Sequence, residues 1–365
     1  MSTEKSTEHS PIIEAPLATE AITIRKMSDN QPKTGFDAFK YNLQFVRGRG
    51  AFEISIVLAV LLAGYITAAI VNPKSFAFLN PNNLSGVISQ AIPVLAILGL
   101  AAGILMVAGE FDLSLGAALT FNAIVFIRVE ESYGLFLGIL AGIASGAFIA
   151  LANGAIVVFT KIPSFIATLG MSFFWAGASI FVNGTTPAMI SAKNRDGLME
   201  FLFAYDFGQF RSQLVWLVII GVIAWFFMHR HRAGNHIYAV GGNEAAAKAI
   251  SINPTKVKLM AFAIYGGLVG FVSILIAVRT SSIQPGGTAT QDFTLFAIAA
   301  AVVGGTALTG GRGSVLGIIC GAALIELIKN GLLLGRAPGF YITLFVGVTI
   351  VIASVFNKLM EGKAR

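Results

Sequence analysis

Charged residues are scarce in this sequence of 365 residues, in which Asp, Glu, Lys and Arg make up 12% and hydrophobic residues 56%. A soluble globular domain carries about one charged residue in four, so this composition cannot cover a water-exposed surface. The apolar residues also come in long blocks with few charges, which is typical of membrane-spanning segments. These shortages exclude a water-soluble domain and indicate a polytopic membrane protein.

Cysteine is nearly absent, since Cys320 is the single example and lies in an apolar run. One cysteine excludes a disulfide within the chain and also a zinc cluster held by thiolates. Three of the four histidines, His229, His231 and His236, fall in one polar stretch, but no carboxylate lies at ligand spacing from them. We therefore predict no metal site.

The signatures of several enzyme classes are missing as well. The sequence contains no Gly-x-x-x-x-Gly-Lys-Ser/Thr phosphate loop, no His-Glu-x-x-His and no Gly-x-Ser-x-Gly. The chain is therefore predicted to have no catalytic residue, and energy for active transport would come from another chain or from an ion gradient. The ionisable residues within apolar stretches are few, namely Glu110, Asp112, Glu326 and Lys329. Glu326 and Lys329 are one helical turn apart and could pair with each other. With so few ionisable residues in its spans, the protein fits a passive conduit for a neutral solute better than a proton relay.

Hydropathy predicts an all-α fold of about ten membrane-spanning helices, some of them broken, with both termini in the cytoplasm. Helices are expected because a lipid-exposed backbone must satisfy its own hydrogen bonds. The predicted spans cover residues 53–71, 84–108, 113–128, 135–160, 163–183, 213–228, 257–278, 293–309, 314–334 and 340–357. In this topology 17 of the 25 Lys and Arg residues lie on the side of the termini, as the positive-inside rule requires. The net charge of +7 thus relates to membrane orientation, and no nucleic-acid partner is predicted.

Two regions are expected along the chain. Residues 1–50 form a polar cytoplasmic tail without the apolar core of a signal peptide, and residues 51–358 form the transmembrane domain. Apolar residues between 36 and 46 recur at helical spacing beside basic ones, which fits a short helix on the membrane surface, with an ordinary linker as the alternative. The connector at 184–212 is polar and aromatic and could hold a short helix.

The first chemically informative feature is a polar break inside an apolar stretch at residues 107–116. Gly109 lets the preceding helix end, and Asp112 or Ser114 can accept hydrogen bonds from the free N–H groups that begin the next helix. We predict that Glu110, Asp112 and Ser114, with Asn122 on the following span, line a translocation pathway or its gate. Capping alone is the alternative interpretation.

The second feature is the polar stretch between 229 and 258, which the topology places in the cytoplasm. Gly241 and Gly242 predict a flexible entry, Asn243 a helix N-cap and the following alanines a short helix that ends before Pro254. We predict that this helix inserts into a partner protein. The residues predicted to carry that coupling are Gly242, Asn243, Glu244, Ala245 and Lys248. A solvated loop helix without a partner is the alternative.

The third feature is a glycine-rich stretch at residues 302–314. Its glycines allow a sharp reversal and close helix contact, and Arg312 is well placed for a lipid phosphate, a helix C-terminus or a partner subunit. The predicted turn residues are Gly304, Gly305, Gly310, Gly311 and Arg312. Breaks at 109–116 and 304–314 occupy corresponding places in the two halves of the chain, which points to a weak internal repeat and to a transport pathway near the breaks.

These three features, in this order, resemble the ribose/xylose/galactose-type permeases, the simple-sugar permease family of bacterial ATP-binding-cassette (ABC) importers. The matching stretches are GEFDLSLGAAL at 109–119, FIATLGM at 165–171, AVGGNEAAAKAISIN at 239–253 and IAAAVVGGTALTGGRGSVLGIICGA at 298–322. The likeness covers about residues 50–357, and it is the combination that is specific, because each motif alone is weak.

The resemblance implies a membrane-spanning permease subunit that moves a monosaccharide or polyol across the bacterial inner (plasma) membrane. It also implies a second permease copy as a homodimer, an ABC ATPase that is usually one tandem fused chain, and a periplasmic solute-binding protein. ATP and Mg would bind to the ATPase, so no cofactor is expected in this chain. The helix at 243–252 would be the coupling helix that sits in a cleft of the ATPase.

The sequence departs from that family at two places. It has Ala108-Gly109-Glu110-Phe111-Asp112 where Gly-Gly-Ile-Asp is common, and Ser251 where a glycine is common. Two alternatives remain, namely a permease of the related branched-chain amino-acid class and a solitary secondary carrier. The GEFDLS and GGNEAA stretches argue against the first, and a solitary carrier would work in liposomes without any ATPase. A membrane enzyme would need a cluster of catalytic polar residues, which the sequence does not contain.

Overall fold

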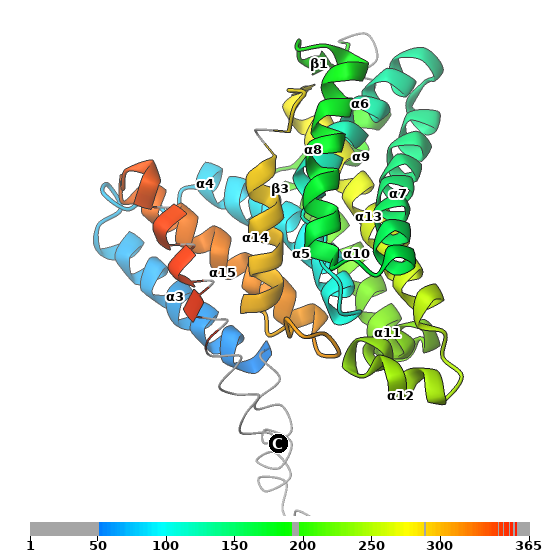
Figure 1. Cartoon of the computed structure of the whole chain (residues 1–365). Helices are drawn as coiled ribbons and strands as arrows, with labels where there is room; N and C mark the ends of the chain where they lie inside the picture. Colours follow the sequence, from blue (N-terminus) through cyan, green and yellow to red (C-terminus); the bar gives the residue numbers. More distant parts are fainter. Residues whose placement is uncertain are drawn as a thin grey trace, which may run out of the picture. The chain divides into compact units, whose positions relative to one another are not determined.

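The computed structural model of the protein describes residues 51–191, 197–287, 290–341, 343–345, 347–349, 351–352 and 355, most of them helical (Figure 1). The predicted polar tail at 1–50 lies outside these residues. The helices are α3 (Ala51–Val71), α4 (Pro81–Gly86), α5 (Ile92–Val107), α6 (Leu115–Tyr133), α7 (Leu135–Thr160), α8 (Ser164–Asn183), α9 (Gly197–Phe203), α10 (Ser212–Arg230), α11 (Arg232–Gly242), α12 (Glu244–Ala249), α13 (Pro254–Thr280), α14 (Gln291–Val303) and α15 (Val315–Leu334). A π-helical turn, η1 (Val87–Ala91), joins α4 to α5.

Seven of the described helical segments are long and apolar enough to cross a membrane. They are Phe52–Val71, Pro81–Val107, Leu135–Thr160, Ser164–Asn183, Ser212–Arg230, Pro254–Thr280 and Val315–Leu334. Their presence agrees with the predicted multi-pass membrane protein, although the count of ten spans stays a prediction. The predicted span at 113–128 corresponds to α6, which carries Arg128, Glu130 and Glu131 near its end.

The predicted span at 293–309 is shorter than expected. Helix α14 has 13 residues and ends at Val303, which gives it a length of about 20 Å at 1.5 Å per residue. A bilayer core is about 30 Å thick, so α14 by itself reaches only part of the way across. The helix stops because Gly304 and Gly305 turn the chain, and Gly305 has a φ of +87° that other residues adopt only with strain.

Helix α5 forms the centre of the described bundle. Its residues from Pro93 to Val107 are buried, and they pack against α10, α13, α14 and α15. A helix that is apolar on every side is stable only when neighbours cover every side, and this arrangement supplies them. Pro93 lacks an N–H group and would clash with a carbonyl one turn earlier in an ideal helix, and the wider π-helical turn η1 lies at that place.

Glycines bring α7 and α13 into direct backbone contact. A Cβ atom added at Gly266 would overlap the carbonyl oxygen of Gly146, and one added at Gly270 would overlap the carbonyl oxygen of Gly142. Gly142 and Gly146 are four residues apart, as are Gly266 and Gly270, so each pair lies on one helix face. This is the small-residue packing by which membrane helices associate closely.

We expect the substitution Gly266→Ala to destabilise the protein by about 1–3 kcal/mol, because the obstructing atoms belong to backbone that cannot move aside. The neighbouring Gly267→Ala is the matched control, since no atom lies within 4 Å of its added Cβ. Thermal unfolding of the two variants in the same detergent measures the difference. Equal melting temperatures would contradict close α7–α13 packing.

Four two-residue strands were not expected from the sequence. Strands β1 (Ala188–Met189) and β4 (Ser282–Ile283) pair antiparallel, and so do β2 (Asp206–Phe207) and β3 (Phe210–Arg211). The connector at 184–212 also contains α9, in agreement with the short helix predicted there. Figure 1 shows β1 at one end of the long helices and α11 with α12 at the opposite end.

Candidate functional site

The break between α5 and α6 is a helix-terminating turn built around Gly109. Gly109 has a φ of +87°, its N–H donates to the Met106 carbonyl, and the Glu110 N–H donates to the Leu105 carbonyl. This pair of reversed hydrogen bonds is a Schellman motif, which satisfies carbonyls that a helix end leaves free. The prediction that Gly109 ends a helix is confirmed.

The same motif recurs where α14 ends. Gly305 also has a φ of +87°, its N–H donates to the Val302 carbonyl, and the Thr306 N–H donates to the Ala301 carbonyl. Helices α6 and α15 then begin after Ser114 and Ser314 respectively. The two predicted breaks therefore share one local backbone design, which supports the internal repeat.

Asp112 lies at the centre of a buried hydrogen-bond network. Its Oδ1 accepts from the Ser114 N–H at 2.7 Å and from the Ser114 hydroxyl at 2.6 Å, while its Oδ2 accepts from Asn153 Nδ2 at 2.9 Å. Ser114 occupies the N-cap position of α6, but its side chain accepts no hydrogen bond from the first turn of that helix. Of the two predicted capping residues, Asp112 therefore accepts from the N–H group at the start of α6, whereas Ser114 does not cap the helix with its side chain.

Side chains from other helices satisfy the backbone of the break instead. The Phe111 N–H donates to Ser164 Oγ and the Leu113 N–H donates to Thr168 Oγ1, both on α8. The Gly116 N–H, in the first turn of α6, donates to Thr294 Oγ1 on α14 at 2.9 Å. These contacts fix the break against α8 and α14, so it is a rigid part of the bundle.

The predicted short helix in the second feature is present as α12. Asn243 is its N-cap, with Oδ1 accepting from the Ala246 N–H at 3.0 Å, as the sequence predicts. The chain leaves the helix through Ser251, whose φ of +65° is in the left-handed region that glycine favours. This explains physically why a glycine would fit at the position where this sequence has serine.

The predicted flexible entry at Gly241 and Gly242 is wrong. Both are the last residues of α11, a helix that the sequence did not suggest. Glycine is needed at position 241 for close packing, because a Cβ there would overlap the carbonyl oxygen of Val107, the last residue of α5. A side chain is thus excluded at Gly241 by the end of the central helix.

Glycines from all three features meet at this point, which we call the glycine junction (Gly109, Gly241, Gly242, Gly310 and Gly311). The Gly311 N–H donates to the Val107 carbonyl at 2.9 Å. A Cβ at Gly310 would lie 2.9 Å from Gly109 Cα, and one at Gly311 would lie 2.5 Å from Gly242 Cα. Segments far apart in the sequence therefore touch backbone to backbone, without side chains between them.

A tyrosine reinforces the glycine junction. The Tyr238 hydroxyl on α11 donates to the Gly313 carbonyl at 2.9 Å. Burial raises the pKa of Tyr238, so the hydroxyl keeps its proton and remains a donor.

Gly304, another of the predicted turn residues, packs against the start of α15, because a Cβ added to it would overlap Gly317 and Ile318.

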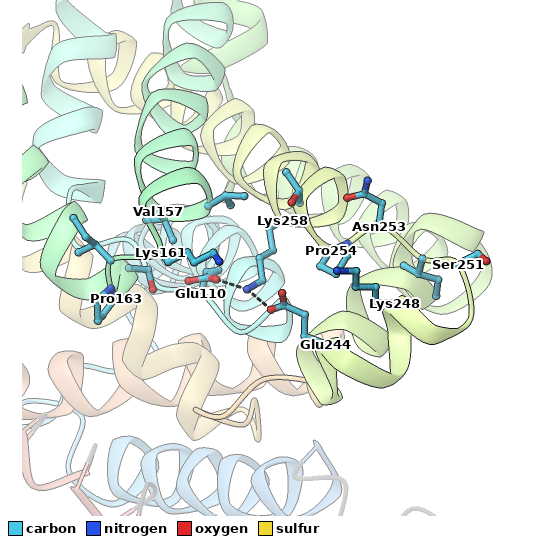
Figure 2. Close-up of a pocket in the computed structure, with 15 residues that line it drawn as sticks. Glu110, Val157, Lys161, Pro163, Glu244, Lys248, Ser251, Asn253, Pro254 and Lys258 are labelled. Carbon is cyan, nitrogen blue, oxygen red and sulfur yellow. Dashed lines mark hydrogen bonds and ion pairs between the residues drawn. The ribbon is translucent and has the colours of Figure 1, made fainter.

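A three-residue ion cluster connects the first two features (Figure 2). Lys258 Nζ on α13 lies 2.8 Å from Glu110 Oε1 in the break and 2.8 Å from Glu244 Oε2 on α12. The Lys258 and Glu110 side chains are 19% and 10% exposed, whereas that of Glu244 is 56% exposed. The cluster therefore has two arms: the contact of Lys258 with Glu110 is protected from water, and its contact with Glu244 is open to water.

The cluster forms part of the wall of a polar cavity of about 790 Å³. Four segments contribute to this wall: the α5–α6 break with Glu110, the α7–α8 turn with Lys161, helix α12 with Lys248, and the start of α13 with Lys258. Figure 2 shows Lys258 between the two carboxylates, with Lys161 and Lys248 on either side of them. The cavity lies at the end of the bundle that the sequence predicts to face the cytoplasm.

The remaining predicted pathway residues do not line this cavity. Asp112, Ser114 and Asn122 are buried among the helices, and Asn122 Oδ1 accepts from Ser145 Oγ on α7 at 2.9 Å. Glu326 pairs with Lys329 on α15 at 2.8 Å, as the sequence predicts. The structure thus brings Glu110 together with the coupling residue Glu244, and it separates both from Asn122.

Sequence reasoning missed Lys258 and Asn153. Lys258 ends the polar stretch that the topology places in the cytoplasm, and its position four residues after Pro254, in the first turns of a long apolar helix, is the available signal. Asn153 lies inside an apolar helix, where an amide needs a partner, and that partner is Asp112. Among the described residues, no group of three His, Cys, Asp or Glu side chains could hold a metal ion.

Comparisons with known proteins bear on this site. A family model described as branched-chain amino acid transport system / permease component matches residues 83–354. The ribose import permease protein RbsC of Escherichia coli (strain K12) is 33% identical over 320 residues, which cover 86% of this chain and 98% of that protein. RbsC of Bacillus subtilis (strain 168) is 31% identical over 302 residues, which cover 82% of this chain and 92% of that protein. The fructose import permease protein FrcC of Rhizobium meliloti is 29% identical over 283 residues, which cover 76% of this chain and 78% of that protein. No solved structure matches the chain.

Proposed function

Because the chain belongs to the family described as branched-chain amino acid transport system / permease component, we propose that it is the membrane-spanning permease subunit of an ABC importer for a monosaccharide or polyol. Relatives named as ribose and fructose import permeases favour a sugar over an amino acid. The branched-chain amino-acid class is therefore the less favoured substrate class.

One observation carries the proposal beyond family membership. Helix α12 lies at one end of the bundle and is tied to the breaks that end α5 and α14, through the glycine junction and through Lys258. A surface helix joined to both helix breaks is what a subunit needs in order to receive motion from a partner. A channel or carrier working alone has no need of such a connection.

The proposed mechanism follows from these contacts. Helix α12 inserts into a cleft of an ATPase, and its Asn243 cap keeps it helical before and during contact. Movement of the ATPase domains displaces α11 and α12, and the glycine junction passes this displacement to the ends of α5 and α14 because no flexible side chain intervenes. A shift of these ends changes which side of the membrane the pathway opens to.

The partners in this proposal are a second copy of the chain, an ABC ATPase in the form of a tandem fused chain, and a periplasmic solute-binding protein. ATP and Mg bind to the ATPase, and the assembly is located in a bacterial inner membrane. The chain itself supplies the pathway and has no hydrolytic role.

The test begins with affinity purification of the tagged chain from mild detergent and identification of the proteins that accompany it. The recovered assembly is then placed in liposomes with its binding protein and offered radiolabelled ribose, fructose, arabinose and ribitol. We expect accumulation of one of these solutes that requires ATP. Transport of the solute by the chain alone, without ATP, would replace the importer by a solitary carrier.

We expect Glu244→Arg to reduce uptake about tenfold or more while the chain still inserts into the membrane. The new cation would face Lys258 and would also oppose the positive N-terminal end of α12, where Glu244 is favourable. Glu200→Arg on α9, an exposed carboxylate at the other end of the bundle, is the matched control and should retain uptake. Normal uptake by Glu244→Arg would refute the coupling role of α12.

A further inference from the structure

Lys258 has an unusual position, because one ammonium group holds two carboxylates that belong to different elements. Glu110 belongs to the break after α5, Glu244 belongs to α12, and each lies 2.8 Å from Lys258 Nζ. Without the cation, two carboxylates would face each other across a few ångströms and repel. The ammonium group is therefore the electrostatic connection between α12 and the break.

The two arms of this connection differ in strength. Glu110 and Lys258 are both largely withdrawn from water, so their attraction is weakly screened and separating them would leave a buried charge without its partner. The Glu244 side chain is 56% exposed, so water can replace its contact with Lys258 at little cost. Displacement of α12 would thus open the Glu244 arm first and leave Lys258 on Glu110.

The other cations near the cavity do not duplicate Lys258. Lys161 and Lys248 are exposed residues of the cavity wall. Lys256, two residues before Lys258 on α13, is exposed and not part of the cavity wall. From its place on α13, Lys258 contacts two of the other segments around the cavity, the α5–α6 break and α12, which sets it apart from these neighbouring lysines.

We propose that Lys258 is a positioning residue that ties α12 to the α5–α6 break, with a lasting arm to Glu110 and an arm to Glu244 that opens and closes as α12 moves. The proposal rests on the proposed importer function for the meaning of that movement. The existence of the two arms can be tested without it.

The first experiment measures the arms in the purified chain. Melting temperatures in detergent are compared for Lys258→Met, Glu110→Gln, Glu244→Gln and the two double variants that include Lys258→Met. We expect both pairs to be non-additive, with the larger interaction for Glu110 and Lys258. Additive effects in both pairs would overturn the proposal, whatever the protein transports.

The second experiment measures coupling in liposomes that contain the whole assembly. The readout is the number of solute molecules accumulated per ATP hydrolysed, with the solute that the wild type accumulates from the panel above. We expect Lys258→Met to lower this ratio about tenfold, while Lys256→Met stays within about twofold of the wild type. The exchange of Glu110→Lys with Lys258→Glu, made together with Glu244→Gln, restores the buried arm with opposite signs and should have a higher ratio than Lys258→Met with Glu244→Gln.

The outcomes separate the two ideas. A wild-type assembly that accumulates solute without ATP would end the importer proposal, while non-additive melting temperatures would still establish the arms. An ATP-driven wild type whose ratio is unchanged by Lys258→Met would overturn the coupling role of Lys258 alone. An exchanged pair with no higher ratio than Lys258→Met with Glu244→Gln would also count against it, because charge pairing with Glu110 would then not be the cause.

Discussion

Replacement of Gly241 by alanine is expected to abolish solute uptake. The added Cβ would overlap the Val107 carbonyl oxygen and would lie 2.8 Å from the Gly311 nitrogen, and both atoms belong to backbone. Relief would require either that α11 moves away from the end of α5 or that Val107 and Gly311 move apart, which would break the 2.9 Å hydrogen bond between them. The strain should also cost about 1–3 kcal/mol of stability.

Uptake in cells and melting temperature in detergent, measured for the same variants, test this expectation. Gly267→Ala serves again as the control, because it adds a methyl group to a helix where no atom lies within 4 Å. A Gly241→Ala protein that inserts into the membrane and transports at the wild-type rate would show that the glycine junction does not carry motion.

Asp112→Asn should impair both uptake and stability more than Glu326→Gln does. Asp112 is 4% exposed, and both of its carboxylate oxygens accept hydrogen bonds. An asparagine has one oxygen, so its amide group would face Asn153 or Ser114 as a second donor and leave a buried group unsatisfied. We expect a cost of about 1–3 kcal/mol.

Glu326 offers a contrast because its partner Lys329 is one turn along the same helix and 22% exposed. A glutamine at this position keeps a side-chain oxygen that can accept a hydrogen bond from Lys329, so no buried donor is left facing another donor. Parallel measurement of uptake and melting temperature in the two variants gives the ranking. The reverse ranking would move the functional region away from the α5–α6 break and toward α15.

Local signals in the sequence are sufficient to predict the structural features that depend only on nearby residues. The cap at Asn243, the helix end at Gly109 and the pair between Glu326 and Lys329 each involve residues within one or two turns. Long apolar runs were likewise sufficient for the seven segments that could span a membrane, since hydropathy is a property of the run itself.

Features that depend on distant residues could not be predicted in this way. The Lys258 cluster joins residues 110, 244 and 258, and hydropathy contains no information about which charges will meet. Gly241 and Gly242 looked like a flexible hinge because glycine favours loops, but here close packing against Val107 outweighs the low helix propensity of glycine. Strands β1 and β4 are paired across a long stretch of sequence. Each of the four strands has only two residues, which is too few to show an alternating pattern.

The glycine junction also determines when a newly made copy becomes usable. Its parts come from the end of α5, the end of α11 and the loop before α15, and more than half of the chain separates Val107 from Gly311. Ribosomes deliver the N-terminal helices first. Under the proposed function, a nascent chain therefore has no finished surface for its ATPase until the residues around Gly311 have been made, and a copy truncated before them would be left out of assembly.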